Sequence, residues 1–171
     1  MAFMDPPASV SSDGTRRGVW IEGGVANINA ITIAEILSGT DVSCYLTVPG
    51  WDPSEDQATI TDSRRCTSTD IQVPGRKSAS PTLEYTFNLD EPTEDVARLA
   101  LTERSTGVFV DILQKPEEDE DIAVGDWYRA FPLKLGAQVP SASATNALDR
   151  INQKAFLVGP VSEISQVVAG S

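Results

Sequence analysis

The chain has 171 residues, of which 40% are hydrophobic and 22% charged, a composition that predicts one globular domain and excludes wholesale disorder. Histidine is absent, which excludes a Ser-His-Asp or Cys-His nucleophile, a histidine-ligated zinc site and imidazole acid–base chemistry. The formal net charge of −12 argues against binding to nucleic-acid phosphates and against binding to an anionic membrane surface, because each kind of binding needs clustered cations.

Residues 1–17 are rich in proline, serine, aspartate and glycine, which predicts a flexible N-terminal arm. The remainder, residues 18–171, is expected to form the single folded domain. Its first strand is predicted at residues 18–22, with Trp20 as a buried anchor. No secretion signal and no apolar run of the ~18 residues that a membrane span needs are seen.

Residues 32–37 predict a short helix that begins with a capping box. The Thr32 side chain can accept the amide proton of Glu35, and the Glu35 side chain can reach back to Thr32. Gly39 is expected to end this helix in the left-handed conformation. Residues 42–48 then predict a second strand.

Residues 49–80 predict a long loop whose two strand-like pieces can form a β-hairpin. Long structured loops in compact domains are usually functional. This one carries two basic pairs in a chain otherwise short of cations, Arg64 with Arg65, and Arg76 with Lys77. They are either two solvated turns or an intermolecular contact with an acidic patch on another copy, such as residues 117–121.

The second half of the chain is predicted to consist mainly of strands. Residues 83–89 alternate apolar and polar side chains, as a half-buried strand does, and residues 93–104 have the apolar spacing of a helix. Further strands are expected at 107–114, at 126–139 with a bend near Pro132, at 150–158 and at 161–168. The fold class is therefore mainly β, a β-sandwich or open barrel with one flanking α-helix.

Acidic residues are concentrated in residues 90–126, which contain 12 acidic and 3 basic residues. They include a run of five acids, Glu117, Glu118, Asp119, Glu120 and Asp121. The run lacks the alternating ligands and turn glycine of a calcium loop, so a solvated loop is expected and no metal site. Cys44 and Cys66 are too few for a metal cluster and are expected to be unrelated buried thiols in a reducing compartment.

The order of these segments resembles the major tail protein, or tail tube protein, of long-tailed, non-contractile bacteriophages. The resemblance is carried by GVWIEGG (18–24), TIAEILSGTDVSCYL (32–46), DSRRCTSTDIQVPGRKSA (62–79), LEYTFNL (83–89) and QKAFLVGPV (153–161). It implies a structural protein of the virion tail, assembled in the host cytoplasm, with no catalytic residue and no cofactor. Six copies would continue their inner sheets into one ring, and stacked rings would form the conduit through which DNA passes without specific binding.

The resemblance also implies partners and contact residues. The partners are further copies of the chain, the tape measure protein, and the tail terminator and tail-tip proteins. The long loop and the arm would link one ring to the next. The expected inter-subunit residues are Trp51, Arg64, Arg65, Arg76, Lys77, Glu117, Glu118, Asp119, Glu120 and Asp121. Polar residues that could line a wet bore are Lys134, Gln138, Asn152 and Lys154.

Two alternatives stay open at this stage, and an enzyme is the weakest interpretation. A tail terminator or head–tail joining protein would form single rings that do not stack. A β-sandwich carbohydrate-binding module could use its three tryptophans, Trp20, Trp51 and Trp127, as a stacking platform, although their separation along the chain favours core or interface anchors.

Overall fold

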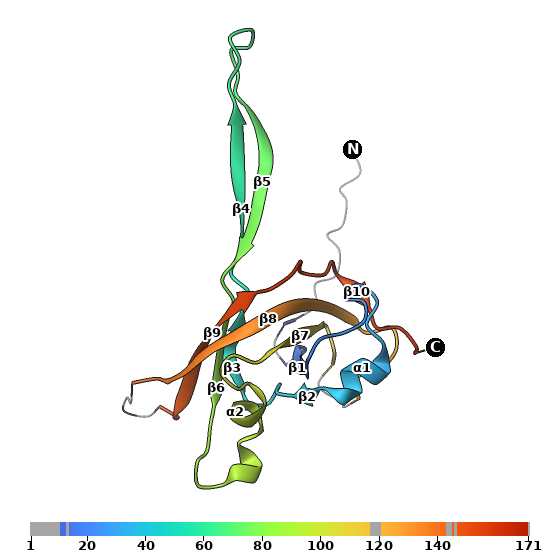
Figure 1. The fold of residues 1–171 in the computed structure, drawn as a ribbon, viewed down its shortest axis with the longest axis vertical. Coiled ribbons are helices and arrows are strands. Elements are labelled where there is room, and N and C mark those ends of the chain that lie inside the picture. The colour runs from blue at the N-terminus through green and yellow to red at the C-terminus, as the bar shows by residue number, and fades with distance from the viewer. Residues whose placement is uncertain (1–10, 13, 117–120, 143–144, 146, 171) are drawn as a thin grey trace, which may run out of the picture.

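The computed structural model describes residues 11–12, 14–116, 121–142, 145 and 147–170. Within them the chain forms one eight-stranded sheet, a separate two-stranded hairpin, two short α-helices and one 3₁₀-helix. Figure 1 shows the sheet curling into a body from which the hairpin projects as a long arm. The N-terminal residues 1–10 and 13, part of the expected flexible arm, lie outside the described residues.

The strands of the body pair antiparallel throughout. They are β1 (Arg17–Glu22), β2 (Thr40–Asp41), β3 (Leu46–Asp52), β6 (Thr82–Thr86), β7 (Thr106–Leu113), β8 (Trp127–Pro140), β9 (Arg150–Leu157) and β10 (Ser165–Gln166). Their order across the sheet is β2-β1-β7-β8-β9-β6-β3, and β10 pairs with the start of β8. The hairpin consists of β4 (Glu55–Asp62) and β5 (Ile71–Ala79), and the helices are α1 (Ile33–Ser38), η1 (Pro92–Glu94) and α2 (Val96–Ala100).

The central strands bury both of their faces, because apolar side chains occupy alternate and intervening positions alike. On one face Trp20, Phe109 and Phe131 belong to a core that also includes residues of β6, β9 and α2. On the other face Val110 packs in a second core with Ile36 of α1. The predicted strands at 18–22 and 107–114 are therefore confirmed as central strands, at 17–22 and 106–113.

The curl of the sheet brings its two ends together. Trp51 of β3 lies with its ring centroid 4.2 Å from that of Phe109 in β7, although three strands separate β3 from β7 in the sheet order. The expected mainly-β fold is confirmed as a large antiparallel sheet plus a small one. No closed barrel forms among the described residues, since β3 pairs only with β6.

The capping box at α1 is confirmed, whereas the role expected of Gly39 is wrong. The Thr32 hydroxyl accepts the Glu35 amide at 3.3 Å, and the Glu35 carboxylate accepts the Thr32 amide at 2.9 Å. Gly39 has an extended backbone with φ −78°. It is glycine for space, because a Cβ would lie 2.7 Å from Val19 Cγ1 and 2.9 Å from the Trp20 carbonyl.

Several element boundaries differ from the prediction. The helix expected at 93–104 is divided into η1 and the short α2. A turn at 42–45 interrupts the strand expected at 42–48, and only Ser165–Gln166 is a strand within 161–168. In β8 the register with β9 shifts between Leu135 and Gln138, beyond the bend expected at Pro132.

Both cysteines are exposed and unbonded, so the expectation of buried thiols is wrong. No helix among the described residues is long and apolar enough to cross a membrane. The described part of the chain also contains no group of three or more cysteine and acidic side chains that could hold a metal ion.

Candidate assembly surfaces

The hairpin β4–β5 is amphipathic, although its residues are exposed along most of its length among the parts of the chain that the structure describes. Ile60 pairs directly with Val73, and Asp62 pairs with Ile71, so the three apolar side chains share one face, with Asp62 at its end next to the turn. Their exposed fractions are 57% for Ile60, 51% for Ile71 and 46% for Val73. The opposite face carries Thr61 and Gln72, also a direct pair. The hairpin predicted within residues 49–80 is thus present, with one apolar and one polar face.

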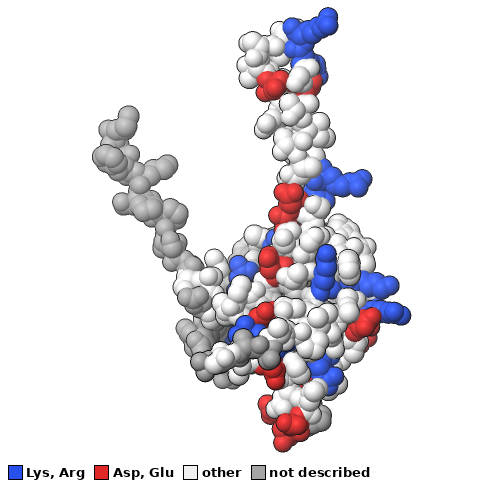
Figure 2. All heavy atoms as spheres, turned by 90° about the vertical axis from the view of Figure 1, so that its left-hand side faces the viewer, with Lys and Arg blue, Asp and Glu red and all other residues white. Residues whose placement is uncertain are grey.

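The four predicted basic residues are distributed along the hairpin and do not form one patch. Arg64 and Arg65 lie in the turn between the two strands, and Arg76 and Lys77 lie in β5. Arg64 forms an ion pair with Asp62 of the same copy at 2.7 Å, and hydrogen bonding to Asp62 raises its pKa. Figure 2 shows basic side chains at the tip and near the base of the hairpin.

The acidic run 117–121 is expected to contact these cations, and Asp121 is the one residue of the run that the structure describes. Asp121 is exposed on the body, ahead of β8, and no contact joins it to the hairpin in the described part of the chain. The other four acids of the run, Glu117, Glu118, Asp119 and Glu120, lie outside the described residues.

Trp51 fixes the root of the hairpin to the body. Its indole lies 4.2 Å from Phe109 and 5.0 Å from Phe131, measured between ring centroids. Aromatic pairs at such distances add to the stabilisation that burial alone provides. The chain then turns at Ser54, which has φ +42°, and β4 begins at Glu55. Within one copy Trp51 therefore acts as an anchor.

Two ion pairs surround this root. Glu55 accepts from Arg129 of β8 at 2.7 Å, and Asp111 of β7 accepts from Arg16 at 2.7 Å. Asp111 and Arg129 are directly opposed in the β7–β8 ladder, so the four charges form one group. Burial raises the pKa of Asp111, and the charge of Arg16 opposes this shift. The group ties the segment before β1 and the start of the hairpin to the same two strands.

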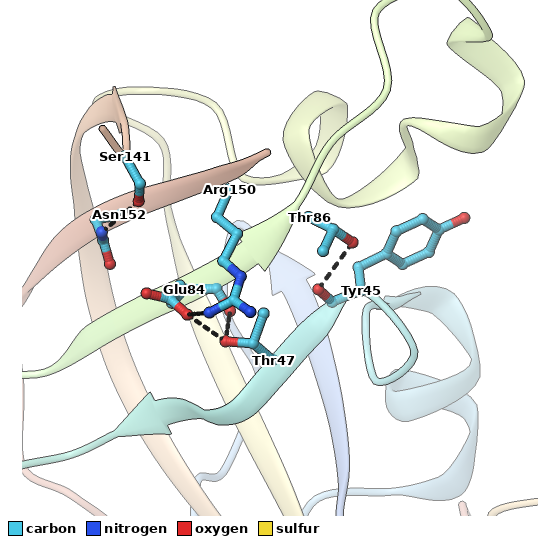
Figure 3. Close-up of polar contacts among 7 residues, drawn as sticks. All are labelled: Tyr45, Thr47, Glu84, Thr86, Ser141, Arg150 and Asn152. Carbon is cyan, nitrogen blue, oxygen red and sulfur yellow. Dashed lines mark hydrogen bonds and ion pairs between the residues drawn. The ribbon is translucent and has the colours of Figure 1, made fainter. Parts of the chain in front are cut away.

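One half of the sheet has an outer face that no other described element covers, here called the uncovered face; it is mostly polar but also exposes Val139 and Phe156. This four-stranded half consists of β3, β6, β9 and residues 134–140 of β8. Its inner side contributes Leu83, Tyr85 and Ile151 to the core. On its outer side Glu84 accepts from the Thr47 hydroxyl at 2.6 Å and from Arg150 at 3.0 Å, as Figure 3 shows.

The contacts on the uncovered face are polar and charge-balanced near its centre. The Thr47 hydroxyl and then Arg150 lower the pKa of Glu84, which favours its ionised carboxylate. Asn152 donates to the Ser141 hydroxyl at 2.7 Å. Where β6 ends, the Thr86 hydroxyl donates to the carbonyl of Tyr45, the residue before β3 (Figure 3). The uncovered face is therefore ordered by side-chain contacts with the strands themselves.

Three of the four residues predicted to line a wet bore share this face. Lys134 is opposed to Phe156, Asn152 to Glu84 and Lys154 to Thr82, and directly opposed residues lie on the same side of a sheet. All three are exposed. Gln138 is the exception, because its amide donates inward to the carbonyls of Arg98 and Leu101 at 2.9 Å.

The four-stranded half has two unpaired edges within the described residues. β3 is the last strand of the sheet and pairs only with β6. β7 begins at Thr106, opposite Lys134, and Leu135 still bonds through its N–H and C=O to Ser105 and Arg104, so only residues 136–140 of β8 pair with β9 alone. Unpaired strand edges offer free N–H and C=O groups to a further strand.

The tryptophans do not form a platform for stacking against sugars. Trp20 is buried, Trp51 packs on Phe109 and Phe131, and Trp127 is 46% exposed at the start of β8. The three tryptophans lie in three different strands, β1, β3 and β8, as is expected of residues that anchor separate elements.

The comparisons with known proteins agree with the resemblance found in the sequence. The family model described as phage tail tube protein matches residues 4–170, which is nearly the whole chain. No curated protein matches the chain. Among the functions considered, the match selects the tube subunit over the terminator, the sugar-binding module and the enzyme. The chain belongs to the phage tail tube protein family and is a non-enzymatic structural subunit of the tail of a phage virion, which assembles with itself into a tube.

Proposed function

We propose that copies of the chain join edge to edge into rings through the four-stranded half of the sheet. The observation that carries this proposal is the combination of two unpaired edges, at β3 and at residues 136–140 of β8, with an exposed and mostly polar face that no other described element covers. The β3 edge of one copy pairs with the β8 edge of the next. Because the two edges are different, the contact is heterologous, and it closes when the rotation between copies allows a ring.

The uncovered face then lines the bore of the ring. Its exposed polar residues, Lys134, Asn152 and Lys154, suit a water-filled channel, since each keeps its polar group in solvent, and Val139 and Phe156 are apolar residues exposed on the same face. Glu84 and Arg150 neutralise each other on this face. Six copies per ring and the passage of DNA without specific binding are the stoichiometry and the use that the family resemblance implies.

Rings stack through the hairpin, with the N-terminal arm as a second link. An isolated two-stranded hairpin is marginally stable in water, so β4–β5 gains stability from a neighbour. Its basic residues, with Arg65 at the tip, meet acidic surface on that neighbour, for which the run at 117–121 is a candidate. The tape measure protein fills the bore before ejection, and the terminator and tail-tip proteins contact the two ends. Assembly takes place in the host cytoplasm.

Electron microscopy of the purified protein at increasing concentration tests the proposed function. Rings or tubes with a central hole are expected, and averaged end views give the number of copies per ring. A protein that stays monomeric at millimolar concentration, with or without preformed tube ends as initiators, contradicts the proposal. Tubes whose subunits contact one another without pairing β3 to β8 contradict the edge assignment.

A further inference from the structure

The hairpin differs in charge from the rest of the molecule. Residues 55–79 contain four acidic and four basic residues, whereas the whole chain has a net charge of −12. Two of those acids are already engaged within the copy, Glu55 by Arg129 and Asp62 by Arg64. Since Arg64 is engaged as well, three cations, Arg65, Arg76 and Lys77, remain against two anions, Asp56 and Asp70, so the hairpin can approach an acidic surface that would repel the body.

Such a surface lies at the opposite end of the molecule. The loop before η1, at the lower end of Figure 1, lies farthest from the hairpin, and Figure 2 shows acidic side chains gathered at this end. Segment 88–99 exposes two large apolar side chains, Leu89 at 65% and Leu99 at 54%. It also exposes three acids, Asp90, Glu91 and Glu94. Apolar and acidic groups thus occur together there, as apolar and basic groups do on the hairpin.

We propose that the apolar face of the hairpin, formed by Ile60, Ile71 and Val73, packs against segment 88–99 of a second copy in the adjacent ring. This inference rests on the proposed stacking of rings through the hairpin. Burial of the three apolar side chains against Leu89 and Leu99 supplies the attraction. The polar face stays in water.

The charges fix how the hairpin lies on its partner. Arg65, in the turn beside Ile71, comes close to the acids of the receiving segment, which sets the register of the contact more than its strength. Because the donor and acceptor surfaces lie at opposite ends of one copy, each added copy presents a new donor, and growth along the tube continues without closure.

Cross-linking from the tip of the hairpin tests where it lies. Cys66 is exposed in the hairpin turn and can carry a benzophenone maleimide in a Cys44→Ser variant, so that no interface residue is changed. Tubes of the labelled protein are irradiated, and the joined peptides are identified by mass spectrometry. Adducts between copies within segment 88–99 are expected. Tubes whose adducts fall elsewhere, such as beside Asp121, overturn the inference and leave the proposed function standing, whereas a wild-type protein without rings or tubes overturns both.

A matched pair of variants tests which face is buried. Ile60→Thr with Val73→Thr keeps β-branched residues in the strands and removes apolar surface from one face. Thr61→Ser with Gln72→Thr changes the directly opposed pair on the other face. The first variant is expected to raise the protein concentration needed for tube formation about tenfold or more, and the second by less than about twofold. Equal effects of the two variants overturn the assignment of the faces.

Charge reversal tests the receiving segment through the recovery of tube growth as well as through its loss. Glu91→Lys with Glu94→Lys, and separately Arg65→Glu, are expected to slow tube growth most at low salt. The combined variant is expected to recover growth, because the two reversed surfaces attract again. Failure of the combination to recover, while circular dichroism shows a folded subunit, overturns the pairing of these charges.

Discussion

The body and the hairpin are built from the same kind of antiparallel strand, but they are stabilised differently. In the body, β1, β7 and β8 are covered on both faces, and Phe109 is fully buried. In the hairpin no residue is buried, although Ile60 and Val73 are as apolar as many core residues. An apolar strand face shows that a partner is needed, and the topology shows whether the partner lies in the same copy or in another.

Removing the hairpin is expected to distinguish the roles of the two regions most clearly. A variant in which residues 55–79 are replaced by a two-residue Asn-Gly turn retains the body, because neither core contains a residue of β4 or β5. Rings are expected to form and elongation to be abolished, as seen by electron microscopy and light scattering. Tubes of normal length from this variant contradict a role of the hairpin in stacking.

Truncating one side chain in each region is expected to give the next largest difference, in the free energy of unfolding. Phe109→Ala leaves a cavity in the core and is expected to lower the free energy of unfolding by about 3–5 kcal/mol. Ile60→Ala in the exposed hairpin is expected to change it by less than about 0.5 kcal/mol. Urea unfolding of the monomer, followed by tryptophan fluorescence, measures both. A large effect of Ile60→Ala means that the hairpin already packs on its own copy.

Breaking the ion pair at the root of the hairpin is expected to have a smaller effect. Arg129→Ala removes the partner of Glu55 and one positive neighbour of Asp111, with a loss of about 1 kcal/mol or less, since the Arg129–Glu55 pair is partly exposed. Hydrogen exchange of β4 is expected to become faster while that of β7 stays unchanged. Arg104→Ala, which alters an exposed arginine away from the root, is the control.

The pH dependence of stability gives the smallest expected effect. Backbone N–H groups of Ala26 and Thr32 lower the pKa of Glu35, so its contribution to stability is present above its unfolded pKa of about 4.5 and is lost as the pH falls through the folded value. Glu35→Gln is therefore expected to reduce the loss of stability on acidification. Asp111 has the opposite sign, because burial raises its pKa and its ionisation destabilises the fold as the pH rises. Thermal melts of Glu35→Gln and Asp111→Asn from pH 3 to 7 measure these slopes.

The sequence predicts features that depend on neighbours along the chain. The capping box of Thr32 and Glu35 needs residues three apart, and the strands at 18–22 and 107–114 need only their own apolar pattern. Gly39 was misassigned because the atoms that exclude a Cβ belong to β1, far from it in sequence. Leu89 continues the alternation of 83–89 yet is exposed, since pairing with β9 ends at Thr86.

The candidate surfaces were only partly predictable for the same reason. The basic pairs and the long hairpin are visible in the sequence, because charge and β-branched residues gather in residues 55–79. The unpaired edges are not, since they arise where β7 begins late along β8. Nor does alternation at Asn152 and Lys154 show whether the exposed side faces open water or an enclosed channel.

The length of β8 has a mechanical consequence. One strand of 14 residues, Trp127–Pro140, runs from the two-faced core into the sheet half with unpaired edges, with one register shift between Leu135 and Gln138. A pull on the far end of β8 loads its ladders with β7 and β9 in shear, where several hydrogen bonds resist together instead of opening one after another. Tension around the circumference of a ring would pass directly into the most tightly packed part of each subunit, with no compliant loop in between.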